Sequence, residues 1–160
     1  ELDVPLFLYP ASTGGAKGPE DARLERFDLT VLLGYAYEET LAAATLILGG
    51  VTQKHPDLDI CISHGGGAIA LLCQKFELLC KFRDWAPDHI KRNGFRSELR
   101  KLWFDNHLEG DIAKNLLVDL LGTDRLVYGT NLGGWDTPTE LDQIAKELTG
   151  NAEKLLRISA

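Results

Sequence analysis

The sequence predicts an α/β protein with a parallel sheet, and two observations support that prediction. Short apolar segments alternate four times with segments of helical character along the 160 residues, which is the pattern of strands joined by helical crossovers. The apolar segments are apolar along their whole length, as expected when both faces of a sheet are covered. The sequence therefore predicts buried parallel strands with helices between them.

The four predicted strands are short apolar runs bounded by turn-forming or polar residues. They are expected at residues 4–9, 58–63, 101–106 and 124–130, and a glycine-rich loop at 11–19 follows the first. The helices that alternate with them are expected at residues 38–54, 66–82, 110–122, 137–150 and 151–158. Gly122 provides the stop for one helix, and Thr137, Pro138 and Glu140 form a capping box that begins another.

Two architectures fit this alternation: an open doubly wound sheet, and part of a (β/α)₈ barrel. A barrel typically needs about 250 residues, so four strand–helix units in 160 residues amount to half of one. The chain begins with Glu1 and contains no Met, which favours a segment of a longer protein. We expect residues 1–160 to form a single, partial domain.

Composition excludes several classes of partner. The net charge of −7 argues against nucleic acid or an anionic membrane as the main partner. The most apolar stretch, residues 41–51, is too short to span a bilayer. The cysteines are odd in number, at positions 61, 73 and 80, and lack metal-site spacing. We expect buried, reduced thiols in a cytoplasmic protein.

Polar residues stand where each predicted strand ends: Tyr9, His64, Asp105 and Asn131. Barrel enzymes place their chemistry at the carboxyl ends of the strands. Open α/β sheets bind ligands at the same edge. Both architectures therefore predict that these four side chains face one functional site.

His64 is the strongest candidate, because three glycines and a helix follow it in the sequence SHGGG. Glycines permit a sharp turn and a close approach to a ligand. An imidazole at this position can ligate a metal, act as an acid or base, or bind a substrate carboxylate. The alternative is a neutral histidine hydrogen-bonded to the backbone. A lipase-type oxyanion hole is rejected because no G-x-S-x-G motif is present.

The other candidates are weaker. Asn131, in YGTNLGGWD, can hydrogen-bond a ligand but is a poor metal ligand, and its loop is otherwise a plain turn. The nearby Asp136 is a possible metal ligand. Tyr9 either binds a carboxylate or packs. His107 is a secondary candidate, whereas His55 and His89 are expected in exposed or loop positions.

Several stretches together resemble one family. LDVPLFLYP, GGVTQKHPDLDICISHGGG, LWFD and LLGTDRLVYGTN are similar to the C-terminal half of the amidohydrolase-related family, of the aminocarboxymuconate-semialdehyde and γ-resorcylate decarboxylase type. The resemblance implies strands five to eight of a metal-dependent (β/α)₈ barrel. It also implies zinc or another divalent metal, and decarboxylation or hydrolysis of small, often aromatic, carboxylic acids.

This chain departs from the family pattern at three positions. Where the family has a metal-binding histidine after the fifth strand, this chain has Tyr9, and the aspartate after the eighth strand is Asn131. The sixth-strand histidine is kept as His64, and a frequent arginine on the following helix is Lys75. A catalytic zinc needs three protein ligands. The resemblance therefore implies a degraded or lost metal site, with His64 as its remaining weak ligand.

The leading expectation is a lyase or hydrolase acting on a small carboxylic acid. His64 is the acid–base group with Asn131 beside it, and Tyr9, Lys75 and Trp135 bind substrate. The alternative is a non-catalytic barrel that binds an acidic small molecule or a partner subunit. A lone half-barrel exposes sheet edges, so we expect an N-terminal half-barrel as partner, or else a homodimer or an unstable chain.

Overall fold

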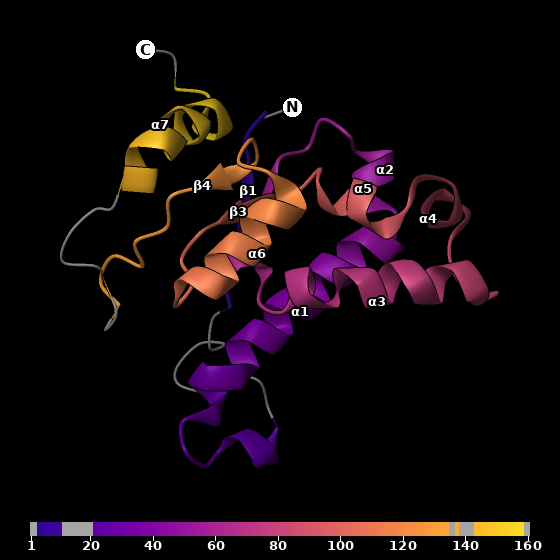
Figure 1. The fold of residues 1–160 in the computed structure, drawn as a ribbon, viewed down its shortest axis with the longest axis horizontal. Coiled ribbons are helices and arrows are strands. Elements are labelled where there is room, and N and C mark those ends of the chain that lie inside the picture. Colours follow the sequence, from indigo (N-terminus) through magenta and orange to yellow (C-terminus); the bar gives the residue numbers. More distant parts are fainter. Residues whose placement is uncertain (1–2, 11–20, 135–136, 138–142, 159–160) are drawn as a thin grey trace.

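Four parallel strands form one sheet in the order β1–β2–β3–β4 (Figure 1). The structure is a computed structural model that describes residues 3–10, 21–134, 137 and 143–158. The strands are β1 (Leu6–Leu8), β2 (Ile60–Ile62), β3 (Trp103–Asp105) and β4 (Leu126–Val127). The register pairs Leu6 with Ile60, Cys61 with Trp103 and Phe104 with Leu126. All four predicted strands and their parallel pairing are confirmed.

The strand order distinguishes between the two predicted architectures. Neighbouring strands in the sheet are also consecutive in sequence. Crossovers between parallel strands are right-handed. When each strand is added on the same side of the preceding one, the connecting helices therefore all lie on one face of the sheet. A doubly wound sheet instead reverses its order at a switch point. The sheet is therefore an arc of a barrel, as the half-barrel prediction requires.

The helices follow the predicted alternation, with additional short ones. They are α1 (Tyr35–Leu48), α2 (Val51–Lys54), α3 (Ile69–Phe82), α4 (Asp88–Asn93), α5 (Phe95–Leu99), α6 (Asp111–Leu121) and α7 (Gln143–Leu156). A π-helical turn at Thr30–Gly34 leads into α1, and 3₁₀ turns lie at Ala22–Leu24 and His64–Gly66. In Figure 1, α1 and α3 lie below the strands in this view and cross at an angle, where the two helices contact each other.

The helices differ from the prediction in three main respects. The expected helix 38–54 is two helices, because Gly50 adopts a φ of 75° and interrupts it. The segment between α3 and β3 contains α4 and α5, which periodicity did not indicate. The expected boundary at 150/151 is absent, because α7 is continuous there. Pro138, Glu140 and the loop 11–19 lie outside the described residues, so the capping box is not observed.

The core lies between the sheet and its helices, and it includes the cysteines. Cys61, Cys73 and Cys80 are buried free thiols, as predicted. Burial raises the pKa of Cys61 to about 12 and that of Cys73 to about 11. Thiols with such high pKa values hold little of the nucleophilic thiolate at neutral pH. These cysteines therefore act as packing residues.

The helical stretch Thr30–Leu48 is longer than the apolar run expected from sequence. By length and composition alone, it is long and apolar enough to cross a membrane. Its residues Ala43 and Ile47, however, are completely buried in the core of the protein. Val31, Leu32 and Leu33 near its start are exposed, so only the C-terminal part of this stretch packs as a core helix of the half-barrel.

The two edges of the sheet differ, although both were expected to be exposed. On β1, the side chains of Leu6 and Phe7 are 46% and 57% exposed. On β4, Leu126 and Val127 are only 0% and 8% exposed, because α7 packs against that strand. The Asn151 amide of α7 also donates a hydrogen bond to the Leu126 carbonyl. Among the described residues, β1 is therefore the edge strand whose apolar side chains are exposed.

Candidate active site

A cavity of about 1080 Å³ lies at the carboxyl ends of the strands. Its polar lining comes from five separate segments of the chain, which follow β1, β2, β3 and β4 or belong to α1. The polar side chains that line it include Tyr9, Glu39, His64, Asp105, His107 and Asn131. The four strand-end residues singled out from the sequence therefore share one cavity.

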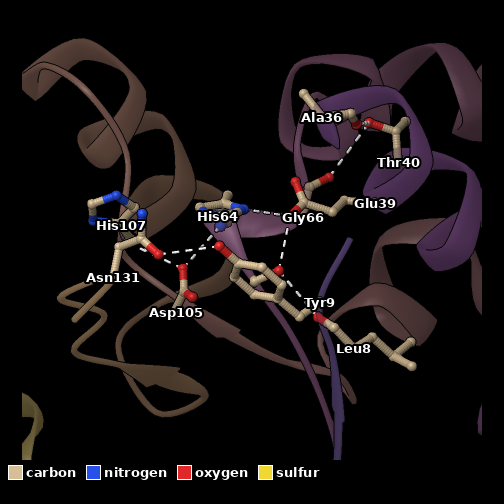
Figure 2. A network of polar contacts seen from close by, with 12 residues as sticks. Leu8, Tyr9, Ala36, Glu39, Thr40, His64, Gly66, Asp105, His107 and Asn131 are labelled. Carbon is tan, nitrogen blue, oxygen red and sulfur yellow. Dashed lines mark hydrogen bonds and ion pairs between the residues drawn. The ribbon is translucent and has the colours of Figure 1, made fainter. Parts of the chain in front are cut away.

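His64 forms a short hydrogen bond with Glu39, which reaches it from α1 (Figure 2). The distance from His64 Nδ1 to Glu39 Oε1 is 2.5 Å. The Ser63 hydroxyl lies 2.8 Å from the same carboxylate oxygen and 3.1 Å from the Leu8 carbonyl. The other oxygen, Glu39 Oε2, is buried without a hydrogen-bond partner among the described residues.

Tyr9 and Asn131 meet across the cavity, although they are 122 residues apart in the sequence. The Tyr9 hydroxyl donates to Asn131 Oδ1 at 3.1 Å. The Tyr9 ring also contacts the His64 ring, with centroids 5.2 Å apart. Both His64 and Asn131 have left-handed backbones, with φ values of 46° and 45°, which non-glycine residues rarely adopt outside functional or turn positions.

Asp105 and His107 form the β3 side of the site. Asp105 Oδ1 accepts hydrogen bonds from the backbone amides of Gly65, at 3.3 Å, and His107, at 3.1 Å. Burial raises the pKa of Asp105, although the His107 amide and the nearby His64 imidazole act in the opposite direction. The His107 and His64 rings lie 5.5 Å apart. One imidazole thus lies between two carboxylates, on α1 and β3.

The glycine turn after His64 allows α1 to approach the site. A Cβ at Gly67 would lie 2.8 Å from Thr40 Oγ1 and even closer to the Ala36 carbonyl oxygen. Thr40 Oγ1 accepts a hydrogen bond from the Ala68 amide at 2.8 Å. The helix that carries Glu39 is therefore fastened to the turn that carries His64.

Some predicted residues are not brought to the cavity. Lys75 is exposed on α3 and is not among the described residues that line the cavity. Trp135 and Asp136 lie outside the described residues. His89 was expected in a loop but is buried on α4, with Nε2 2.9 Å from the Ile47 carbonyl oxygen. It therefore has the structural role of a satisfied core histidine.

Glu39 is the site residue that sequence reasoning missed. A signal was present, since Glu39 lies four and eight residues before Ala43 and Ile47. That spacing places all three on one helix face, and the structure buries all three. A carboxylate on the buried face of a helix is rare unless it is paired.

The described residues do not complete a metal site by themselves. Within the described part of the chain, no three His, Cys, Asp or Glu side chains converge in a group that could hold a metal ion. A catalytic zinc site normally has three such ligands. The cavity-facing donors among the described residues therefore do not fit a three-ligand metal site.

A sequence profile of the Amidohydrolase family matches residues 1–158, and the chain belongs to that family. It is 26% identical over 159 residues to 2-amino-3-carboxymuconate-6-semialdehyde decarboxylase of Dictyostelium discoideum, covering 98% of this chain and 43% of that protein. The expected family membership is therefore confirmed. The match covers most of this chain but less than half of that relative.

Solved structures give the same fold. The 5-carboxyvanillate decarboxylase of Sphingomonas paucimobilis superposes with a TM-score of 0.76 at 18% identity, covering 98% of this chain and 50% of that one. The dihydroxybenzoic acid decarboxylase of Polaromonas sp. JS666, solved with manganese and 2-nitroresorcinol, gives 0.66 at 17% identity, covering 98% and 50%. The chain thus spans about half the length of these proteins and has the fold of half their barrel.

Proposed function

We propose that this chain supplies the proton-donor side of a decarboxylase active site for a small aromatic carboxylic acid. The observation that carries the proposal is the Glu39–His64 pair at the wall of the strand-end cavity. Its family relatives include proteins named as decarboxylases. An imidazole paired with a buried carboxylate can hold a proton beside a bound acid and deliver it.

The proposed step needs no oxidant or reductant. The bond between the substrate carbon and its carboxylate breaks, and carbon dioxide leaves. The electron pair remains on that carbon, which takes a proton from the His64 imidazolium at Nε2. Glu39 keeps the remaining Nδ1 proton in place, and a solvent proton then restores the imidazolium.

Tyr9 and Asn131 orient the substrate in this proposal. Their mutual hydrogen bond places a hydroxyl and an amide on the same wall as the His64 ring. Both groups can hydrogen-bond a carboxylate or a ring hydroxyl. Trp135 follows Asn131 by four positions in the sequence, and we propose it as a further substrate-binding residue. Lys75 is exposed on α3, outside the described lining of the cavity, and its substrate-binding role stays a prediction from the sequence.

We also propose that the metal site of the family is degraded in this protein. The support is chemical, since Tyr9 and Asn131 stand where the family resemblance places a histidine and an aspartate. Neither is an adequate replacement for those ligands. Plasma mass spectrometry of protein purified without added metal tests this, and near-stoichiometric zinc or manganese would contradict it.

The partner of this half-barrel is proposed to dock at the open β1 edge. Exposed apolar strand edges favour pairing with another chain or segment, and Leu6 and Phe7 provide such an edge. The partner we propose for this edge is the complementary N-terminal half-barrel. If residues 1–160 are produced alone, we propose a homodimer, which light scattering would detect.

The proposed compartment is the cytoplasm.

A second candidate function is favoured by Tyr9 and Asn131, the two positions that depart from the metal ligands of the family. If the changes to Tyr9 and Asn131 abolish turnover, the cavity still presents hydrogen-bonding groups to an acid. The protein would then bind an acidic small molecule or a partner subunit without chemistry. This reading predicts that a bound ligand raises the melting temperature while no carbon dioxide is released.

The test is the turnover of 2,6-dihydroxybenzoate and 5-carboxyvanillate by the complete protein, followed as carbon dioxide release. We expect His64→Asn to lower kcat by about 10²- to 10⁴-fold, the usual contribution of a general acid. His55→Asn is the matched control, because His55 is an exposed histidine on a different segment, and it should retain full activity. Unchanged turnover in His64→Asn would contradict the proposal.

A further inference from the structure

We infer that Glu39 is a positioning residue, which fixes the tautomer and orientation of His64 through Nδ1. The inference rests on the proposed function of His64 and deepens it, since it assigns a role to a residue on a different element. It concerns the side chain on α1 that the strand-end pattern does not indicate.

The first support is the geometry of the contact. Glu39 Oε1 lies 2.5 Å from His64 Nδ1, and the carboxylate is only 3% exposed. An ionised carboxylate only accepts hydrogen bonds. The ring must therefore carry its proton on Nδ1 to make this contact. In the neutral ring, Nε2 is then the basic nitrogen, on the side of the ring away from Glu39 (Figure 2).

The second support is the rigidity of the carboxylate. The Ser63 hydroxyl lies 2.8 Å from the same oxygen that faces His64. Ser63 immediately precedes His64, so one carboxylate oxygen contacts two consecutive residues at the end of β2. Thr40, the neighbour of Glu39 on α1, accepts from the Ala68 amide beyond the glycine turn. Helix and turn therefore hold the pair from both sides, as a preorganised site requires.

The third support is the incomplete hydrogen bonding of the Glu39 carboxylate. Its Oε2 atom is buried, and no described residue provides it with a hydrogen-bond donor. Buried carboxylates kept for stability alone normally have both oxygens satisfied. Glu39 is instead held through one oxygen only, and that oxygen faces His64. This pattern of hydrogen bonds is expected of a residue whose role is to orient the His64 ring.

The consequence is independent of whether His64 donates a proton or ligates a metal. Partners bonded to the second nitrogen of a functional histidine fix its tautomer and ring orientation, and their loss costs about 10- to 100-fold in activity or metal affinity. We expect Glu39→Gln to lower kcat by that factor while KM changes by less than about threefold. The reason is that Glu39 acts through His64 rather than on the substrate.

The direct test is nitrogen-15 NMR of the histidine rings in the complete, labelled protein. In the wild type, the His64 signals should report a proton held on Nδ1. In Glu39→Gln they should shift toward a mixture of tautomers, because an amide can accept or donate. The matched control is Glu38→Gln, the adjacent glutamate on the same helix, which should leave both the ring signals and kcat unchanged.

Two further variants keep the test decisive. Glu39→Asp retains a carboxylate and should recover part of the kcat lost in Glu39→Gln. Ser63→Ala removes the second donor to Glu39, together with the contact to the Leu8 carbonyl. It should lower kcat by a few-fold, and it serves if Glu39→Gln does not fold. Unchanged ring signals and kcat in the folded variants would overturn the inference. If the wild type turns over neither acid, the proposed function fails, and the ring signals alone decide the role of Glu39.

Discussion

Two glutamates of this half-barrel, Glu39 on α1 and Glu98 on α5, are almost equally buried, at 3% and 0% exposure, but their hydrogen bonding differs. Glu98 Oε2 accepts from the Thr52 hydroxyl at 2.8 Å and from Lys101 at 2.7 Å, and Oε1 accepts from Asn93 at 3.0 Å. Glu39 uses Oε1 for both of its partners, and no described donor reaches Oε2.

The difference shows how burial alone misleads. Removing a carboxylate from water is costly, and hydrogen bonds to both oxygens offset that cost. Glu98 meets this condition and links α5 to α2, so its expected contribution is to the free energy of unfolding. Glu39 meets it only in part and lines the cavity. Unsatisfied buried groups in native proteins concentrate where function requires them.

The largest expected effect on stability is therefore at Glu98. We expect Glu98→Ala to lower the free energy of unfolding by about 3 kcal/mol, because it leaves the buried Thr52 hydroxyl without its acceptor and removes a charge-assisted pair. Urea denaturation of the complete protein measures it. Turnover per folded molecule should stay near the wild-type value.

The control for this change is Glu147→Ala, because Glu147 is an exposed glutamate on α7. It should alter the free energy of unfolding by less than about 0.5 kcal/mol, as is usual for surface positions. If Glu98→Ala lost activity and kept its stability, the two glutamates would have exchanged the roles assigned to them.

The next effect concerns the turn that supports Glu39. Gly67→Ala introduces a Cβ against Thr40 and Ala36 at a φ of +64°. We expect a loss of about 2 kcal/mol in stability, from backbone strain and the displaced helix. We also expect a loss of turnover, because moving α1 moves the Glu39 carboxylate away from His64. Urea denaturation and the decarboxylase assay measure the two effects.

Gly110→Ala is the matched control for the Gly67 variant. Gly110 also has a positive φ, +82°, but a Cβ there has nothing within 4 Å. It should therefore cost only the backbone strain, about 1 kcal/mol, and leave turnover unchanged. Equal losses of activity in both variants would show that packing of α1 against the turn does not support the site.

The sequence was sufficient to predict the parallel sheet and the edge that carries the site, because both follow from local patterns. Apolar runs located all four strands, and the residue after each run located the rim. The short helices α4 and α5 were not predictable in this way. Their formation depends on burial of Phe95, Leu99 and Ile90 in a core that involves distant segments, and helices of six and five residues show little periodicity.

The site was predicted in part for the same reason. His64, Tyr9 and Asn131 each follow a strand, so the topology alone brings them together. Glu39 lies 25 residues before His64 on a helix, and only the close packing allowed by Gly67 makes them neighbours. Lys75 shows the converse, since it follows the turn in sequence but lies on the exposed side of α3.

The smallest expected effect is the pH dependence of the Glu98 cluster. Burial favours a raised pKa for Glu98, but hydrogen bonds from Lys101, Asn93 and Thr52 outweigh it and lower the pKa. A pKa that is lower in the folded protein stabilises it above the unfolded value of about 4.3, and this stabilisation is lost as the pH falls through the folded value.

Comparing wild type with Glu98→Gln isolates this contribution from the other carboxylates. The difference in their free energies of unfolding should be constant between about pH 7 and pH 5 and should shrink below about pH 4.3. Glu147→Gln, at an exposed site, should show no such change. A difference that persisted undiminished toward pH 3 would mean that the Glu98 network does not depend on charge. The contrast with Glu39 would then rest on the number of hydrogen bonds alone.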